Sequence, residues 1–305
     1  MPPHVAFVFL DGVGLGPGGS TNPLDTDALP AFERLAGGQR WTEAAHVVDE
    51  PGHVFRPIDA SLGVDGLPQS GTGQTTLFAG FNAPEMAGRH WGPYPHSATF
   101  DALAAQSLWQ RLLDAGVPKD ELAFLNAYPP VFFAHAEAKN RWTTTTRMTR
   151  AAGLPLFGVD DVLAGRALTA ELTGQAWHER LGLAVPTITP FQAGQRLHAL
   201  ARQRRVVLFE YYLTDKAGHA RDDEQAAAIL GHLDGFFAGY LEGFDPERDL
   251  LVVSSDHGNL EALDRKPHTT NPVPLVALGR RADAFRAAAS LIDVTPALVT
   301  AAAAS

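Results

Sequence analysis

The chain has 305 residues, 45% of them apolar, which is enough to bury the core of one large domain or of a core with a small insert. Its formal charge of −10 argues against nonspecific binding to nucleic acid or to anionic membranes. The absence of cysteine excludes disulfides, thiolate metal sites and a cysteine nucleophile, so that any metal must be held by nitrogen and oxygen. No apolar run approaches the ~20 residues that cross a bilayer, and no targeting segment is evident, so we expect a cytoplasmic protein.

In chain order, four short apolar runs predict strands that are buried on both faces of a sheet. Helical patterns lie between them, so strand and helix alternate along the chain. This order predicts an α/β fold with a doubly wound, mostly parallel sheet. The strands are expected at residues 4–10, 206–212, 250–254 and 273–278, and the main helices at residues 98–115, 191–202, 224–241 and 291–304.

Ionisable side chains stand at the ends of these strands. Asp11 follows the first run, Asp215 the second, and Asp256 with His257 the third, while His268 precedes the fourth. Ligands of doubly wound sheets gather outside the carboxyl ends of the strands. We therefore expect these side chains to form one site.

Residues 129–185 do not follow the alternating pattern, being rich in Thr and Arg with turn signals near Gly153 and Gly165. We interpret this segment as an inserted cap, and residues 1–128 with 186–305 as the core. Residues 139–150 carry four basic and no acidic side chains. A solvated charged face and a phosphate-binding role both explain that run.

Asp215 and His219 are four residues apart, which places them on one side of a helical turn where both can bind one ion. A carboxylate with an imidazole suits Zn or Mn. Alone, the pair also fits a helix N-cap with a surface histidine.

Asp256 and His257 meet at a turn before Gly258, and they also fit a catalytic base with its orienting carboxylate. His268 lies in a proline-rich turn whose rigid backbone can hold an imidazole in place.

A turn of small residues at 67–74 leads into an apolar helix expected at residues 75–81. A hydroxyl here lies near a helix N-terminus, where a phosphate or an alkoxide is favoured. An ordinary Ser or Thr N-cap is the alternative. Ser70, Thr72, Thr75 and Thr76 are rival hydroxyls, and spacing alone does not choose among them.

Two further features of the sequence are weaker signals of function. Gly14–Gly19 matches the GxGxxG pattern of dinucleotide-binding folds, but Pro17 lies inside it and no helix opens after it, so we interpret it as a loop beside Asp11. Of the histidines outside the motifs, His90 and His96 follow the expected helix and are candidates to line a pocket; the others are interpreted as surface or core residues.

The five motifs FLDGVG, QSGTGQ, DKAGH, SSDHGN and HTTNPVP occur in this order over residues 9–274. This set resembles the metalloenzyme branch of the alkaline phosphatase superfamily, in particular cofactor-independent phosphoglycerate mutase and phosphopentomutase. The resemblance implies two divalent metal ions, Mn or Zn. It assigns Asp215, His219 and His268 to one ion and Asp11, Asp256 and His257 to the other, with Ser70 between them as the phosphoryl acceptor.

The chain departs from the mutases at Gln74, where they carry histidine, and in its short cap. Basic side chains that are candidates for substrate binding cannot be mapped onto the family's substrate contacts. They are Arg89, Lys139, Arg141, Arg147 and Arg150.

The resemblance therefore implies phosphoryl transfer on a small phosphorylated metabolite through a phosphoserine, in the manner of phosphoglycerate mutase. The alternatives are a metal-dependent phosphomonoesterase, a phosphodiesterase or phosphonate hydrolase, and a noncatalytic binding protein that has kept the fold. No nucleic-acid or membrane partner is expected, and the sequence does not indicate an oligomeric state.

Overall fold

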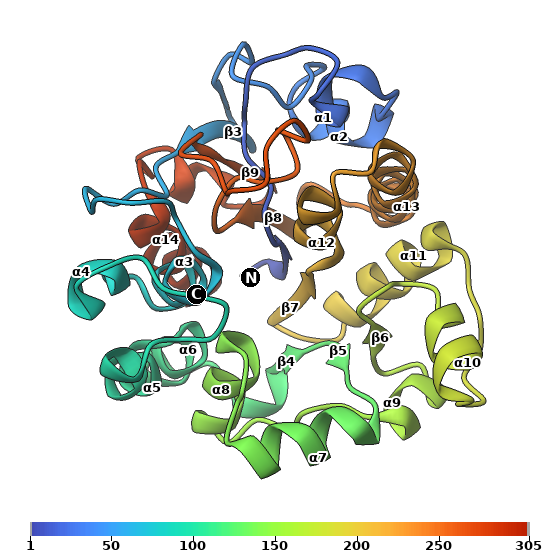
Figure 1. Cartoon of the computed structure of the whole chain (residues 1–305). Coiled ribbons are helices and arrows are strands. Elements are labelled where there is room, and N and C mark those ends of the chain that lie inside the picture. The colour runs from blue at the N-terminus through green and yellow to red at the C-terminus, as the bar shows by residue number, and fades with distance from the viewer. Residues whose placement is uncertain (1, 304–305) are drawn as a thin grey trace.

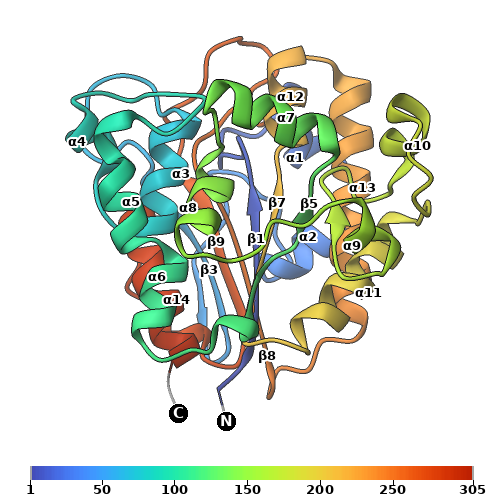
Figure 2. The same ribbon diagram turned by 90° about the horizontal axis from the view of Figure 1, so that it is seen from below.

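The computed structural model describes residues 2–303, in which a seven-stranded sheet lies between two layers of helices (Figure 1, Figure 2). The strand order is β2-β3-β9-β8-β1-β7-β4, and β1 pairs in parallel with both β7 and β8. The predicted α/β fold with a mostly parallel sheet is confirmed. The strands are β1 (His4–Leu10), β2 (Val48–Glu50), β3 (His53–Ile58), β4 (Leu122–Phe124), β7 (Val206–Tyr211), β8 (Asp249–Ser255) and β9 (Val273–Gly279).

β9 differs from the other predicted strands because it runs antiparallel to β8 and to β3. A parallel pair requires a crossover connection of a dozen or more residues, usually a helix, to bring the chain back to the starting edge. Residues 256–272, between β8 and β9, form turns and coil without a helix, so the chain folds back directly. His268 lies in this connection, which places it at the edge of the sheet where β8 ends.

Alternate side chains of β1 enter two different cores, which explains why the strand is apolar throughout. Ala6, Val8 and Leu10 belong to one core, whereas Phe7 and Phe9 belong to the other, and all five are fully buried. Phe78 of α3 packs against both phenylalanines.

Helices cover the two faces of the sheet in separate groups (Figure 2). The first core is covered mainly by α1 (Pro23–Thr26), α2 (Pro30–Leu35), α11 (Pro190–Ala201), α12 (Leu213–Ala220) and α13 (Asp223–Glu242). The second is covered by α3 (Ser70–Ala79), α4 (Ala83–Ala87), α5 (Phe100–Gln106), α6 (Leu108–Asp114) and α14 (Val294–Ala303).

Three predicted helices have different bounds in the structure. The helix expected at residues 98–115 is interrupted at Ser107, whose side chain caps the start of α6 by accepting from the amide of Gln110. The helix expected at 75–81 begins five residues earlier, at Ser70. The helix expected at 291–304 starts as a 3-10 turn, Leu291–Asp293, and Ala304 lies outside the described residues. Further 3-10 turns are Ser97–Thr99, Lys119–Glu121 and Ala282–Phe285.

Residues 129–185 fold into short elements that pack on the main sheet. A two-stranded sheet joins β5 (Asn126–Ala127) to β6 (Leu168–Thr169), and Figure 2 shows α7 on the same side of the molecule as α12. Met148 and Phe157 are buried in the two main cores. The division into core and cap stays a prediction. The helices here are α7 (Pro130–Lys139), α8 (Thr144–Ala151), α9 (Val159–Leu163) and α10 (Gln175–Leu181).

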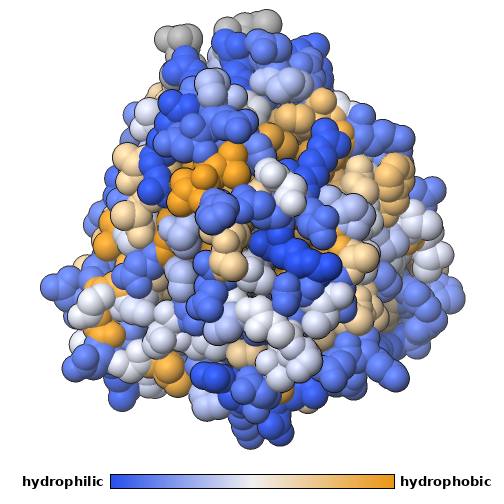
Figure 3. All heavy atoms as spheres, turned by 90° about the horizontal axis from the view of Figure 1, so that it is seen from above, coloured by the Kyte–Doolittle hydropathy of each residue, from blue (hydrophilic) through white to orange (hydrophobic). Residues whose placement is uncertain are grey.

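The surface over α1 and α2 mixes hydrophilic and hydrophobic side chains and shows no continuous apolar band (Figure 3). Within residues 2–303, no helix combines the length and the apolar character that a membrane span requires.

Candidate metal centre

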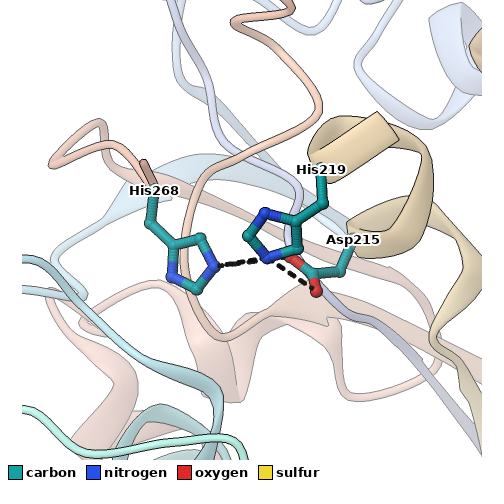
Figure 4. Close-up of side chains that lie close together, drawn as sticks. All are labelled: Asp215, His219 and His268. Atoms are coloured by element: carbon teal, nitrogen blue, oxygen red, sulfur yellow. Dashed lines mark hydrogen bonds and ion pairs between the residues drawn. The ribbon is translucent and has the colours of Figure 1, made fainter. Parts of the chain in front are cut away.

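Asp215, His219 and His268 form a first group of metal-binding side chains (Figure 4). Asp215 and His219 lie one turn apart on α12, and the Nε2 atom of His219 is 3.4 Å from Oδ2 of Asp215. The Nε2 atom of His268 lies 3.1 Å from Nε2 of His219 and 3.6 Å from Oδ1 of Asp215. The two imidazoles thus direct nitrogen atoms toward each other, as they would around a shared cation (Figure 4).

The orientation of His268 is fixed by the backbone before α3. Its Nδ1 atom lies 2.8 Å from the carbonyl oxygen of Pro68, to which the ring donates. This hydrogen bond leaves Nε2 without its hydrogen and available as a ligand, as outer hydrogen bonds do in known metal sites.

Asp11, Asp215 and His257 form a second group, whose ligand atoms all lie within 4.8 Å of one another. The Nε2 atom of His257 is 3.4 Å from Oδ1 of Asp11 and 3.6 Å from Oδ2 of Asp256. The sequence-based assignment grouped Asp256 with Asp11 and His257. In the structure Asp256 lies beside this group, while Asp215 takes part in both groups.

Ser70 is the first residue of α3, and its Oγ atom lies 3.0 Å from Nε2 of His257. The other three hydroxyls form hydrogen bonds with backbone groups. Thr75 and Thr76 donate to carbonyls of their own helix, while Thr72 exchanges hydrogen bonds with the backbone of Trp91. Ser70 is therefore the hydroxyl among these four that contacts a candidate ligand.

Burial and mutual repulsion disturb the ionisation of three side chains of the second group and its neighbourhood. Burial, and then the charges of Asp256 and Asp215, raise the pKa of Asp11 well above its ordinary value. Burial also raises the pKa of Asp256 to about 8. Burial, reinforced by His268, lowers the pKa of His257 well below its usual range. Without a cation, Asp11 and Asp256 thus favour the protonated form beside the neutral imidazole of His257.

The donor set fits divalent cations. Oδ1 of Asp11 and Oδ2 of Asp256 are buried oxygen atoms without a hydrogen-bond partner in the described part of the chain. Both face Nε2 of His257, so that unsatisfied oxygens converge with a neutral ring nitrogen. Such buried polar atoms are costly unless something binds them, and oxygen with imidazole nitrogen is the ligand set that Zn and Mn accept.

Comparison with known proteins agrees with this geometry. The sequence model of the Metalloenzyme superfamily matches residues 195–304, the segment that carries five of the clustered side chains. The chain is 30% identical over 112 residues to a 2,3-bisphosphoglycerate-independent phosphoglycerate mutase of Pseudomonas paraeruginosa, covering 34% of this chain and 22% of the relative. A Cereibacter sphaeroides mutase is 28% identical over 110 residues, with the same coverage. The chain thus aligns with about a fifth of these relatives.

The fold extends the likeness to the rest of the chain. The alkaline phosphatase of the Antarctic bacterium TAB5 superposes with a TM-score of 0.58 at 11% identity, covering 99% of both chains. The resemblance to the alkaline phosphatase superfamily of metalloenzymes is confirmed. The strand order of this alkaline phosphatase-like fold places the cluster at the carboxyl ends of β1, β7 and β8.

Two of the five candidate substrate residues, Arg141 and Arg147, line a cavity of about 610 Å³. Trp91 and Tyr94 line the same cavity, and the backbone of Trp91 hydrogen-bonds to Thr72 in the first turn of α3. Within residues 2–303, neither arginine makes an ion pair, and Nε of Arg147 is buried without a partner. His96 also lines this cavity, as the sequence suggested.

The other three candidates lie outside this cavity. Arg89 sits over the ring of Trp91 beside a separate pocket, which His90 also lines, and Lys139 is exposed in the last turn of α7. Arg150 stacks on the ring of Trp142 at 3.7 Å.

Three polar residues of the candidate metal centre received no role from the sequence. Gln74 donates to Oδ2 of Asp11 (3.0 Å), and Asn259 donates to Oδ1 of Asp215 (2.7 Å). Glu261 is almost fully buried and lies between the loops of the site. Gln74 and Asn259 stand within recognised motifs and Glu261 stands two residues beyond one, a position that could have drawn attention to all three.

Proposed function

We propose that this chain is a phosphoryl-transfer enzyme that depends on two divalent cations, Mn or Zn, and forms a phosphoserine at Ser70. One cation is held by Asp215, His219 and His268, and the other by Asp11, Asp256 and His257. The single observation that carries the proposal is the position of Ser70. Its hydroxyl stands at the N-terminus of α3, 3.0 Å from Nε2 of the candidate ligand His257.

The chain's own residues prepare this hydroxyl for attack. The N-terminal end of α3 favours the negative charge of a phosphoryl group. Burial keeps His257 neutral and Nδ1 faces the carbonyl oxygen of Gly258, which leaves the Nε2 lone pair for a cation that would lie beside the Ser70 hydroxyl. Gln74 and Asn259 hold carboxylates of Asp11 and Asp215 in place. Bound divalent cations supply positive charge that stabilises the attacking and leaving oxygens of an in-line displacement at phosphorus.

In the transfer step, a bond forms between phosphorus and Oγ of Ser70 while the bond from phosphorus to the substrate oxygen breaks. The departing oxygen takes up a proton as Ser70 loses one, which yields an alcohol and phosphoserine. A mutase returns the phosphoryl group to another hydroxyl of the retained alcohol. A phosphatase passes it to water.

The cavity beside α3 suits a substrate with a second anionic group. Among the residues that the structure describes, Arg141 and Arg147 have no acidic partner, in a protein whose formal charge is −10. Unpaired arginines bind carboxylate or phosphate through two parallel hydrogen bonds. A small metabolite with a phosphoryl group at Ser70 and a carboxylate or second phosphate in the cavity fits this arrangement, and a phosphoglycerate is such a molecule.

Hydrolysis is the second candidate, and one feature of the cavity favours it. Trp91 and Arg141 in its lining are exposed, so the cavity that would hold the rest of the substrate is open to water. A phosphodiester or phosphonate substrate would use the same cluster and is distinguished by assay. Isomerised product without free phosphate identifies a mutase, whereas stoichiometric phosphate release identifies a hydrolase.

The test is to trap phosphate on the protein and to locate it by mass spectrometry. Wild-type protein, loaded with Mn or Zn, is incubated with phosphoglycerates, pentose phosphates, an aryl phosphate and a diester. We expect phosphate on Ser70, no phosphate on Ser70→Ala, and turnover of that variant reduced by about 10³-fold or more. Thr72→Ala is the matched control and should retain the label. Phosphate on Thr72, or undiminished turnover by Ser70→Ala, would refute this assignment.

A further inference from the structure

Glu261 is a buried carboxylate whose two oxygen atoms accept four hydrogen bonds. Oε2 accepts from the backbone amides of Gly14 (3.0 Å) and Asn259 (2.8 Å). Oε1 accepts from the hydroxyl of Thr269 (2.5 Å) and from the side-chain amide of Asn271 (3.0 Å). Its exposed fraction is only 2%. A charge so deeply buried is tolerated only because every oxygen is satisfied.

The four donors come from the three loops that carry candidate metal ligands. Gly14 belongs to the loop that follows Asp11, and Asn259 to the loop that follows Asp256 and His257. Thr269 and Asn271 belong to the loop of His268, and Thr269 also forms a backbone bridge with Gly258. One carboxylate therefore joins all three loops.

A fourth ligand is connected through Asn259. The backbone amide of Asn259 donates to Glu261, while its side chain donates to Oδ1 of Asp215 (2.7 Å) and to the carbonyl oxygen of Asp215 (3.1 Å). Asp215 takes part in both groups of candidate ligands. Glu261 is thus two hydrogen bonds away from the carboxylate that the two groups share.

The neighbouring glycines leave room for this carboxylate. A Cβ atom at Gly14 or at Gly258 would overlap Oε1 of Glu261, and one at Gly16 would lie 2.7 Å from its Cγ. Three loop positions therefore carry the smallest residue at the points where the backbone approaches Glu261. The packing is specific to a side chain of this length at this place.

We propose that Glu261 is the positioning residue of the metal centre: it holds the loops of Asp11, His257 and His268 in the geometry that binds cations. This inference rests on the proposed function. Its carboxylate touches none of the reacting atoms and acts through Gly14, Asn259 and Thr269. Outer hydrogen bonds that orient ligands typically change metal affinity by about 10–100-fold.

The test compares cation binding by wild-type protein, Glu261→Gln and the matched control Glu224→Gln, an exposed carboxylate on α13. Binding of Mn and of Zn is measured by equilibrium dialysis with elemental analysis, and turnover is measured as a function of cation concentration. We expect Glu261→Gln to bind about 10–100-fold more weakly and to recover most of its kcat at saturating cation. The control should match wild type.

Near-ultraviolet circular dichroism of the metal-free variants shows whether they fold. Asn271→Ala removes one of the four donors and is a milder variant. If Glu261→Gln does not fold, we expect the same loss of cation affinity in Asn271→Ala. Unchanged cation affinity in a folded variant overturns the inference, as does a lower unfolding temperature without any change in cation dependence. Wild-type protein that binds no cation overturns the proposed function as well. Wild-type protein that binds cations but forms no phosphoserine overturns the function alone.

Discussion

Glu210 is a second buried carboxyl group beside the metal centre, and it has no role in the proposed chemistry. It lies near the carboxyl end of β7 with 6% of its surface exposed, and its Oε2 atom accepts from the hydroxyl of Thr145 (2.6 Å). Burial raises its pKa to about 7, although the hydrogen bond from Thr145 acts in the opposite direction. Its negative charge also contributes to the raised pKa of Asp11. The Glu210 side chain is thus held largely uncharged below neutral pH.

A consequence for stability follows from the sign of this shift. Because the folded pKa of Glu210 lies above the unfolded value of 4.5, the folded state binds the proton more tightly. The stability that the neutral carboxyl provides is complete below the unfolded pKa and is lost as the pH rises through about 7. We predict that Glu210→Gln, which can still accept from Thr145, gains stability over wild type by on the order of 3 kcal/mol between about pH 5 and about pH 8.

The measurement is urea unfolding of metal-free protein across this pH range, with a chelator present. Glu224→Gln is the control, because that side chain is exposed on α13. If the difference in the free energy of unfolding between Glu210→Gln and wild type stays constant with pH, Glu210 is ionised in the folded protein over the whole of this pH range.

At the scale of elements, the first turn of helix α3, which carries Ser70, is held in place by a neighbouring segment. A Cβ atom at Gly71 would overlap the carbonyl oxygen of Tyr94, so the 91–94 segment packs directly on the first turn of the helix. We predict that Gly71→Ala destabilises the protein by about 1–3 kcal/mol and lowers turnover, since overpacking forces the backbone apart beside the nucleophile.

The control for this substitution is Gly231→Ala, in the interior of α13, where a Cβ atom would meet nothing within 4 Å. Alanine should stabilise that exposed helix by about 0.5–1 kcal/mol and leave turnover unchanged. Urea unfolding and steady-state assays report both quantities. If Gly71→Ala behaves as Gly231→Ala does, α3 is not held by the 91–94 segment.

The sequence predicted the elements whose signal is local. The apolar runs gave β1, β7, β8 and β9 to within about one residue at each end, because strands buried on both faces carry no polar interruption. The ionisable side chains at their ends were expected to meet, and the structure brings Asp11, Asp215, Asp256, His257 and His268 together at one edge.

Features that depend on distant contacts were not predictable in this way. The helix expected at residues 98–115 is interrupted where Ser107 caps a new helix. No strand had been predicted for the residues that form β2 and β3. Asp215 takes part in both groups of ligands because α12 follows β7, which pairs directly with β1, the strand that Asp11 follows. The role of Glu261 requires three loops to converge, and spacing within any one of them carries no sign of it. Only two of the five suggested basic residues line the cavity beside α3.

For the whole molecule, the candidate metal centre gathers acidic side chains in a protein that is already acidic. Four carboxyl groups, those of Asp11, Asp215, Asp256 and Glu261, lie at one edge of the sheet, and bound cations would offset the repulsion that arises when they ionise. A ligand that binds only the folded state stabilises it by mass action. We predict that Mn or Zn at about 100 times its dissociation constant adds about 2.7 kcal/mol to the free energy of unfolding.

Thermal unfolding with and without added cation measures this gain. Asp215→Asn should lose most of it, because Asp215 belongs to both groups of ligands. Asp223→Asn, an exposed carboxylate in the first turn of α13, is the control and should respond as wild type does. An unfolding temperature that is indifferent to both metals would argue against a cation site in this chain.

The interior position of β1 in the sheet also bears on the way this segment is synthesised. β1 has its two neighbours in β7 and β8, which begin about 200 and 245 residues later along the chain at Val206 and Asp249. Until they emerge, the apolar segment HVAFVFL has no partner in the sheet, and nascent chains that expose such segments are prone to aggregate. We expect the candidate metal centre to assemble only after His268 has been translated, because that residue completes the group formed with Asp215 and His219.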